Sequence, residues 1–224
     1  LGDVGTGKTT ISRILMQALN AQEGFDFHII LDPNYKSEFQ FLASLVKMFS
    51  LKPNFKSTLD YKEEIERYLF KKGVEEQKTI VLVIDEGQKL NTSHLEILRT
   101  LLNYETNEYK LLQLVLMSQI ELLPRIRKIK NFFDRISLKY IINPLDEHET
   151  SEMITFRLVQ AGFKSGDGGL FSEDAIQLIH AHTQGYPRRI AMICHDALEY
   201  IVMHEQRVVD ESVIRALIAA DIHL

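Results

Sequence analysis

The stretch Gly2-Asp3-Val4-Gly5-Thr6-Gly7-Lys8-Thr9 lies almost at the start of the chain and decides how the rest is interpreted. Its glycines let the backbone turn tightly and aim its N–H groups at the oxygens of a phosphate. A helix starting near Lys8 would add the positive end of its dipole. The Lys8 ammonium would reach the β- and γ-phosphates, and the Thr9 hydroxyl would ligate Mg²⁺. The spacing predicts a phosphate-binding loop; the alternative is a glycine loop that only caps a helix.

An acidic pair, Asp85-Glu86, follows the most apolar stretch of the chain, residues 79–84 (TIVLVI). A continuous, β-branched run of this kind is typical of a strand buried on both faces of a parallel sheet. Carboxylates at its end would lie at the edge of the sheet where α/β proteins bind ligands. We expect Asp85 to hold Mg²⁺ and Glu86 to polarise an attacking water. The alternative is that the pair caps the helix that follows.

Apolar periodicity predicts alternating strands and helices up to Pro144, followed by helices alone. The predicted strands cover 27–31, 79–84, 111–117 and 136–142. The predicted helices cover 9–21, 36–50, 58–72, 92–105, 120–129, 146–162, 172–184, 187–204 and 210–220. The fold class is therefore α/β, with a parallel sheet core flanked by helices over 1–144 and a small helical lid domain over 145–224.

Composition excludes several classes of protein. The chain has 224 residues and a formal net charge of −5, which does not suit a globally basic nucleic-acid binder. The single cysteine, Cys194, cannot form an internal disulfide, which fits a reducing cytoplasm. No apolar run approaches the length that spans a bilayer. Because the chain starts at Leu1, directly before the loop, we expect it to be a fragment that lacks the strand preceding the loop.

The motifs together resemble the AAA+ ATPases, and within them the ATPase domain of the general secretion pathway protein A group. The stretches that carry this resemblance are the loop with Thr10, 83–90 (VIDEGQKL), 95–99 (LEILR), 112–122 (LQLVLMSQIEL) and 185–190 (GYPRRI). Gly87 and Ile120 depart from that group, which commonly has Ala and Pro there. The resemblance implies a P-loop NTPase core with its first strand missing, and ATP and Mg²⁺ as ligands. The nucleotide-binding residues would be Gly2, Asp3, Val4, Gly5, Thr6, Gly7, Lys8, Thr9 and Thr10.

The resemblance also assigns roles to three residues outside the loop and the acidic pair. Gln119 matches the polar sensor of the γ-phosphate or attacking water, although it could be a turn residue after a strand. Arg188, favoured over Arg189, matches the lid arginine that senses the nucleotide; the alternative is a solvated charge. Arg135 resembles the arginine finger offered to a neighbouring subunit, where the alternatives are a surface pairing with Asp134 or a finger at Arg125 or Arg127.

The function implied by the resemblance is ATP hydrolysis that drives the assembly or remodelling of a partner, such as a bacterial secretion or pilus apparatus. The active unit would be a homo-oligomer in the cytoplasm, attached to the inner membrane through segments outside this chain. The alternative is a DNA-associated, ATP-dependent switch of the transposition-regulator type. The chain has no Asn-Lys-x-Asp guanine reader, which favours ATP over GTP.

Other conspicuous residues are interpreted as structural. His180, His182 and His195 lie on predicted lid helices without a convincing set of further metal ligands. Cys194 lies between Ile193 and His195 in a predicted helix and is expected to be a small buried residue rather than a nucleophile. The basic run 125–130 is expected to be a solvated face, with contact to DNA or a partner as the alternative.

Overall fold

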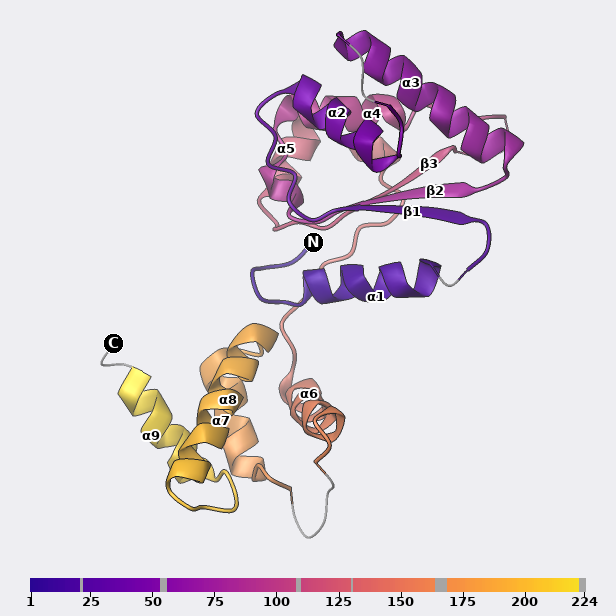
Figure 1. Cartoon of the computed structure of the whole chain (residues 1–224). Helices are drawn as coiled ribbons and strands as arrows, with labels where there is room; N and C mark the ends of the chain where they lie inside the picture. The colour runs from indigo at the N-terminus through magenta and orange to yellow at the C-terminus, as the bar shows by residue number, and fades with distance from the viewer. Residues whose placement is uncertain (21, 53–55, 108–109, 130, 164–168, 222–224) are drawn as a thin grey trace. The chain divides into compact units, whose positions relative to one another are not determined.

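In the computed structural model (Figure 1) the described residues are 1–20, 22–52, 56–107, 110–129, 131–163 and 169–221; for 19, 20 and 221 only the backbone is described. The chain divides into two compact units, each held together by its own internal contacts. The α/β unit comprises Leu1–Asp3 and Lys8–Ile141, and the helical unit comprises Val4–Gly7 and the residues from Ile142 onward. The division into domains at residue 144 stays a prediction.

A parallel sheet of three strands forms the centre of the α/β unit. Its strands are β1 (Phe25–Ile30), β2 (Thr79–Ile84) and β3 (Leu112–Leu116), in the order β1-β2-β3. In the central strand, Val83 pairs with Ile29 on one side and with Val115 on the other. The side chains of β2 from Ile80 to Ile84 are all buried, which confirms the interpretation of the apolar run as an internal strand.

Helices cover both faces of this sheet, α1 on one and α2 to α5 on the other (Figure 1). The helical elements are α1 (Lys8–Asn20), α2 (Glu38–Met48), α3 (Thr58–Phe70), η1 (Lys71–Glu75), η2 (Gly87–Lys89), α4 (Thr92–Leu101), α5 (Leu122–Lys128) and η3 (Phe133–Arg135). The main core lies on the face covered by α2 to α5 and includes the fully buried Phe41, Leu69 and Leu98. This confirms an α/β fold with a helix-flanked parallel sheet.

Polar side chains fix where several helices begin. At the start of α2 the Ser37 hydroxyl accepts a hydrogen bond from the Gln40 backbone amide. At the start of α4 the Asn91 side chain accepts one from the His94 backbone amide. At α3, Ser57 and Asp60 form a reciprocal capping box. These caps explain why the helices begin where they do, within about two residues of the positions predicted from periodicity alone.

The predicted strand over 136–142 is wrong. Among the described residues the sheet ends at β3, and the segment after η3 does not belong to it. A strand needs a neighbour that exchanges backbone hydrogen bonds with it, and alternating apolar residues do not supply one. Leu138 and Tyr140 are accordingly exposed, and the Tyr140 carbonyl accepts a hydrogen bond from the Leu1 ammonium at 2.7 Å.

The helical unit has a small core of its own. Its helices are α6 (Glu147–Gln160), α7 (Glu173–Thr183), α8 (Pro187–Met203) and α9 (Glu211–Asp221). Ile154, Ile179, Ile190 and Ile214 are among the residues buried between them. The four helices predicted after Pro144 are therefore confirmed, while residues 164–168, between α6 and α7, lie outside the described residues. No helix in the described ranges is both long and apolar enough to cross a bilayer.

Gly185, in the turn between α7 and α8, is fixed by close packing. Its φ is +72°, and a Cβ built on it would lie 1.9 Å from the carbonyl oxygen of Leu145. The Leu145 amide donates a hydrogen bond to the Gly185 carbonyl at 2.9 Å, so the two backbones cannot separate without losing this bond. A side chain at this position must therefore displace the segment that leads into α6.

Gly185→Ala should lower the free energy of unfolding by about 3 kcal/mol or more, because it adds a backbone overlap to the strain of a positive φ. The matched control is Gly162→Ala: Gly162 has a φ of +89° but nothing within 4 Å of its Cβ position. Only strain remains there, which costs about 1 kcal/mol. Chemical denaturation followed by circular dichroism compares the two variants; equal losses would contradict the overlap.

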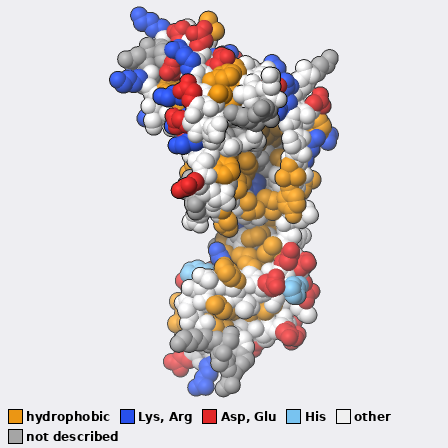
Figure 2. All heavy atoms as spheres, turned by 90° about the vertical axis from the view of Figure 1, so that its right-hand side faces the viewer, with side chains coloured by type: hydrophobic (Ala, Val, Ile, Leu, Met, Phe, Trp, Pro, Cys, Tyr) orange, Lys and Arg blue, Asp and Glu red, His pale blue; other side chains and the backbone are white. Residues whose placement is uncertain are grey.

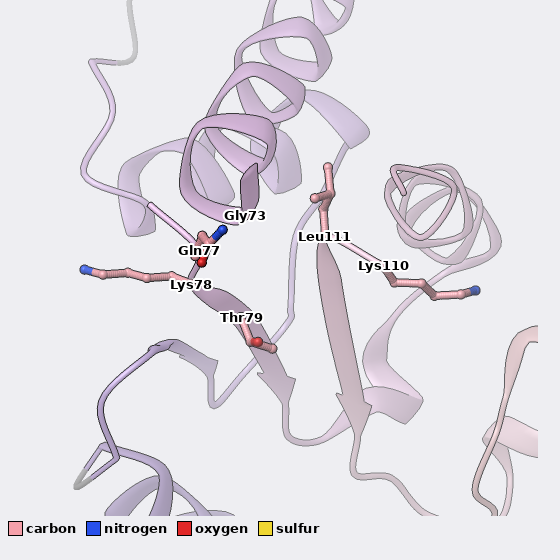
Figure 3. A pocket seen from close by; sticks show the side chains of 6 residues that line it. All are labelled: Gly73, Gln77, Lys78, Thr79, Lys110 and Leu111. Atoms are coloured by element: carbon pink, nitrogen blue, oxygen red, sulfur yellow. The ribbon is translucent and has the colours of Figure 1, made fainter. Parts of the chain in front are cut away.

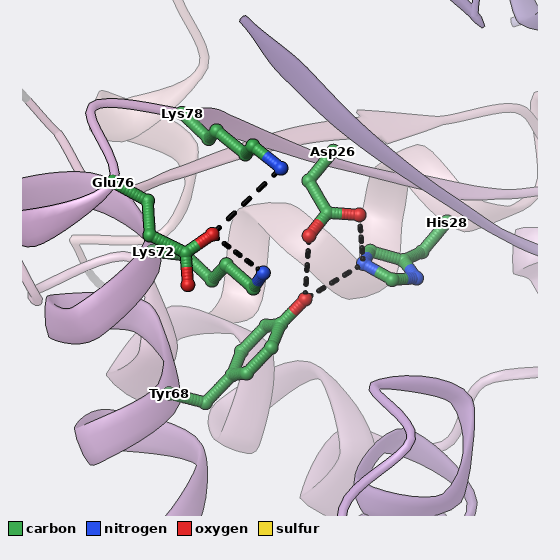
Figure 4. Close-up of polar contacts among 6 residues, drawn as sticks. All are labelled: Asp26, His28, Tyr68, Lys72, Glu76 and Lys78. Carbon is green, nitrogen blue, oxygen red and sulfur yellow. Dashed lines mark hydrogen bonds and ion pairs between the residues drawn. The ribbon is translucent and has the colours of Figure 1, made fainter.

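A hydrogen-bonded polar cluster lies between β1 and α3 (Figure 4). The Tyr68 hydroxyl donates to Asp26 Oδ2 at 2.8 Å, and His28 Nε2 lies 3.1 Å from Asp26 Oδ1 and 3.2 Å from the Tyr68 oxygen. Burial lowers the pKa of His28; Asp26 opposes this shift and Lys72 adds to it. Burial, helped by the hydrogen bond to Asp26, raises the pKa of Tyr68.

The lowered pKa of His28 makes stability depend on pH. The folded protein binds the proton less readily than the unfolded chain, whose histidine pKa is about 6.5. Stability is therefore complete above about pH 6.5 and is lost as pH falls below it toward the folded pKa. His94, whose pKa burial also lowers, acts in the same direction. His28→Gln should reduce the loss of unfolding free energy between about pH 7.5 and 5.5; an unchanged loss would contradict this assignment.

Candidate functional site

The glycine loop contains two residues with positive φ. Gly5 and Gly7 have φ values of +85° and +91°, a conformation that glycine adopts without steric cost. The Gly2 amide donates to the Ser118 carbonyl at 3.1 Å, which ties the start of the loop to the residues after β3. The first helix, α1, begins directly after the loop at Lys8. The predicted loop and helix N-terminus are therefore both present.

Lys8 is held by the loop in which it lies. Its side chain is only 6% exposed, and its ammonium donates to the carbonyls of Gly2 at 2.9 Å and Asp3 at 2.6 Å. A buried ammonium needs such acceptors, because an unpaired charge in the interior is costly. An ammonium carries three donors, so Lys8 can keep a loop carbonyl while it binds a phosphate oxygen.

Thr9 and Asp85 meet at the carboxyl end of β2. The Thr9 hydroxyl donates to Asp85 Oδ2 at 2.7 Å, and the Glu86 amide donates to Asp85 Oδ1 at 2.8 Å. Asp85 is 1% exposed, so these donors compensate the burial of its carboxylate. A hydroxyl and a carboxylate side by side are hard oxygen donors of the kind that Mg²⁺ prefers, so the two residues fit this metal.

Glu86 has an unusual backbone and a specific side-chain partner. Its φ of 53° and ψ of 34° place a non-glycine residue in the left-handed region, where the chain leaves β2 and enters η2. Its Oε2 accepts a hydrogen bond from Gln88 Nε2 at 2.7 Å. Gln88 Oε1 in turn accepts one from the Gln119 backbone amide at 3.1 Å. The predicted base and the predicted sensor position are therefore connected through Gln88.

Arg125 on α5 completes this arrangement. Its guanidinium donates to the Gln88 carbonyl at 2.5 Å and to the Leu90 carbonyl at 2.9 Å. From the sequence, Arg125 is expected to be part of a solvated basic run or a competing arginine finger, and Gln88 has no predicted role. Their contacts follow from how α5 approaches the turn after β2, and no spacing in the sequence encodes that approach.

The two other predicted arginines lie in separate places. Arg135 is in η3, and its Nη1 donates to the Asn131 carbonyl at 2.7 Å. Arg188 is an exposed residue in the first turn of α8, and within the helical unit its amide donates to the Gly5 carbonyl at 3.3 Å. The Arg189 guanidinium lies 5.2 Å from the centre of the Tyr186 ring. Only Arg188 thus contacts the loop, through its backbone.

The remaining loop residues differ in their surroundings. Val4 is 61% exposed, and Thr10 is also exposed, whereas Thr6 is buried. Within the helical unit a cavity of about 800 Å³ is lined by both loop and helix residues, among them Val4, Gly5, Tyr186, Arg188 and Met192. Its volume lies in the range of small-molecule pockets.

A second cavity, of about 260 Å³, lies at the opposite end of the strands from Asp85 (Figure 3). Thr79 at the start of β2 and Leu111 before β3 line it. Lys78 and Lys110 are its basic residues, and they extend away from each other. Cations that do not converge form no binding site for an anion, so this cavity is not a candidate for the phosphates.

The residues interpreted as structural have ordinary surroundings. Burial raises the pKa of Cys194 to about 12, which makes its thiol a poor nucleophile. His180 Nε2 lies 3.2 Å from the Leu145 carbonyl oxygen, and His195 pairs with Glu199 at 3.2 Å. In the described part of the chain, no three His, Cys, Asp or Glu side chains are grouped in a way that could hold a metal ion.

Known proteins similar to this chain point to one family. General secretion pathway protein A of Aeromonas hydrophila is 35% identical over 199 residues, which cover 88% of this chain and 35% of that protein. The chain thus spans about a third of the length of this relative.

Three solved structures show the same fold at 15 or 16% sequence identity. Cdc6p of Pyrobaculum aerophilum has a TM-score of 0.70, with 93% of this chain and 56% of that chain covered. ORC2 of Aeropyrum pernix has a TM-score of 0.68, with 97% and 60% covered. The Holliday junction branch migration motor RuvB of Thermotoga maritima has a TM-score of 0.64, with 98% and 59% covered.

The family match covers the residues that build the site. Residues 1–126 match the family described as AAA domain, and this range contains the loop, the acidic pair, Gln119 and Arg125. More than half of the 224 residues are matched, so the chain belongs to the AAA domain family.

Proposed function

We propose that this chain binds ATP together with Mg²⁺ and hydrolyses the ATP to ADP and phosphate. The observation that carries the proposal is the 2.7 Å hydrogen bond from the Thr9 hydroxyl to Asp85 Oδ2 beside the glycine loop. It joins the first turn of α1 to the end of β2, so phosphate-binding and metal-binding groups share one edge of the sheet. Membership of the AAA domain family supports nucleotide binding.

Each residue of the site has a distinct role in this proposal. The loop N–H groups and Lys8 neutralise the phosphates, while Thr9 and Asp85 hold Mg²⁺, which would offset charge on the phosphate oxygens. Glu86 orients the attacking water and accepts its proton. Gln119 supplies an amide near the γ-phosphate.

Two arginines would act from outside this edge of the sheet. Arg188 would read the nucleotide from the helical unit, since its amide already contacts the loop at Gly5. Arg135 would serve a neighbouring subunit in a homo-oligomer, because a guanidinium stabilises charge that develops on a transferring phosphoryl group. Its own contact, with the Asn131 carbonyl, is at the surface and can be exchanged.

The cellular role that we propose is based on the similarity to general secretion pathway protein A. Similarity to general secretion pathway protein A suggests that hydrolysis drives the assembly or remodelling of a protein partner in a bacterial secretion or pilus apparatus at the inner membrane. This chain matches about a third of the length of that relative. The partner and the oligomer are therefore proposed for the whole protein.

A DNA-associated switch is the second candidate, and it depends on the basic run that starts at Arg125. Arg125 is bound to two backbone carbonyls, Arg127 and Lys128 are exposed, and Lys130 lies outside the described residues. On the face shown in Figure 2, basic and acidic side chains are intermixed over the α/β unit. Retention on DNA that falls steeply with salt would favour this candidate over the first.

Glu86→Gln should lower the rate of ATP hydrolysis roughly a hundredfold or more, because an amide cannot accept the proton of the attacking water. ATP binding should persist, since Lys8, Thr9 and Asp85 are unchanged. Single-turnover hydrolysis and equilibrium binding of labelled ATP measure the two effects. Glu121→Gln, a change of the same kind at an exposed residue near the site, is the control. Turnover equal to wild type would remove Glu86 from the role of base.

The hydrolysis rate per subunit should rise with protein concentration, because Arg135 of one subunit would complete the site of the next. Arg135→Ala should abolish this rise, with a loss of roughly a thousandfold in rate at saturation. Arg127→Ala is the matched control, since Arg127 is an exposed arginine of the same region. A rate per subunit that stays flat over the range in which oligomers form would exclude a shared site.

A further inference from the structure

The turn after β2 contains a side chain with two specific partners and no role assigned so far. Gln88 lies in η2, two residues after Glu86, and its amide group bonds to the Glu86 carboxylate on one side and the Gln119 backbone amide on the other. Both contacts are within hydrogen-bond distance, at 2.7 and 3.1 Å. The amide group therefore spans the gap between the end of β2 and the residues after β3.

The chemistry of the two partners fixes the orientation of this amide. A backbone N–H can only donate, so the atom of Gln88 that faces Gln119 must be the oxygen. An ionised carboxylate can only accept, so the group that faces Glu86 must be the NH₂. Neither a carboxylate nor a hydrocarbon at position 88 can satisfy both partners. The two contacts together thus require an amide of this length.

The backbone on both sides of Gln88 is also fixed. Arg125 donates to the carbonyls of Gln88 and Leu90 at 2.5 and 2.9 Å, and the planar guanidinium suits such a pair of acceptors. The Gly87 amide donates to the Met117 carbonyl at 2.9 Å. These bonds attach η2 to α5 and to the end of β3.

The strained residue in this turn is Glu86 itself. A left-handed non-glycine residue is strained and persists only where its surroundings hold it. Here Gln88 holds the side chain of Glu86 while Arg125 holds the turn that follows. The contact with Gln88 engages one lone pair of Oε2, and a carboxylate has further lone pairs that can accept a proton from water.

We propose that Gln88 is a positioning residue for Glu86: its NH₂ group orients the Glu86 carboxylate, and its own oxygen, anchored by the Gln119 amide, links that orientation to the end of β3. Arg125 keeps Gln88 in place by binding its backbone carbonyl. The inference rests on the proposed ATP hydrolysis. It assigns no contact between Gln88 and nucleotide.

Gln88→Glu is the sharpest test, because it separates the two contacts of the amide. A carboxylate keeps an acceptor for the Gln119 amide but places a second negative charge against Glu86 in place of a donor. In the full-length protein that contains this chain, kcat for ATP should fall roughly ten- to a hundredfold, the value of a hydrogen bond to a charged group. The Kd for ATP should stay at its wild-type value, because the glycine loop and Lys8 are unchanged.

Gln88→Ala should lower kcat by a similar factor, since it removes the donor to Glu86. In the Glu86→Gln background, both substitutions should change the residual rate less than about twofold, because a residue that acts through Glu86 has no effect once Glu86 is gone. Gln113→Ala, at an exposed glutamine of β3, is the control for glutamine replacement.

Arg125→Lys tests the support for the turn, since one ammonium cannot reproduce the fork of a guanidinium on two carbonyls. We expect a loss in kcat that Arg127→Lys, two residues along on the same helix, does not show. A KM for ATP close to wild type would accompany both.

The outcomes separate this inference from the proposed function. An inactive wild-type protein would overturn the proposed function, and the inference with it. An active wild type with unchanged kcat in Gln88→Glu and Gln88→Ala would overturn the inference alone. So would a loss of the same size in the Glu86→Gln background, or a loss that appears as weaker ATP binding, since each indicates that Gln88 does not act through Glu86.

Discussion

The α/β unit depends on the hydrogen bond that joins Thr9 and Asp85, two residues 76 positions apart in the sequence. A carboxylate that is 1% exposed is costly unless donors surround it. The Thr9 hydroxyl and the Glu86 amide are those donors, one for each carboxylate oxygen. Because the Asp85 amide also donates to the Ile30 carbonyl, the start of α1, the end of β2 and the end of β1 are held at one point.

Sequence patterns predicted the parts of this arrangement that are encoded locally. The run 79–84 forms β2 with the predicted bounds, because a strand with strands on both sides and helices on both faces needs an unbroken apolar surface. The segment 136–142 (ISLKYII) is also rich in apolar residues but is not part of the described sheet. The difference is the presence of a hydrogen-bonding neighbour, which composition does not report.

The same distinction separates the proposed site residues that short motifs indicate from those that they do not. Lys8 and Thr9 are placed by the loop, and Asp85 and Glu86 by the strand before them, so short motifs predict them. The contacts of Gln88 and Arg125 form only where α5 packs against η2. Gly87 lies close to α5, since a Cβ there would lie 3.5 Å from Leu122 Cδ2, but a glycine in the sequence does not indicate which element packs against it.

The left-handed backbone of Glu86 explains how adjacent carboxylates can have different tasks. Along a strand, consecutive side chains point to opposite faces, so an Asp-Glu pair in regular geometry would place the two carboxylates on opposite sides of the sheet. At Glu86 the chain leaves the strand with a φ of 53° and enters a short turn. Asp85 can therefore remain buried against Thr9, while Glu86 meets Gln88 from the turn itself. The left-handed conformation of one residue thus lets two adjacent carboxylates face different partners.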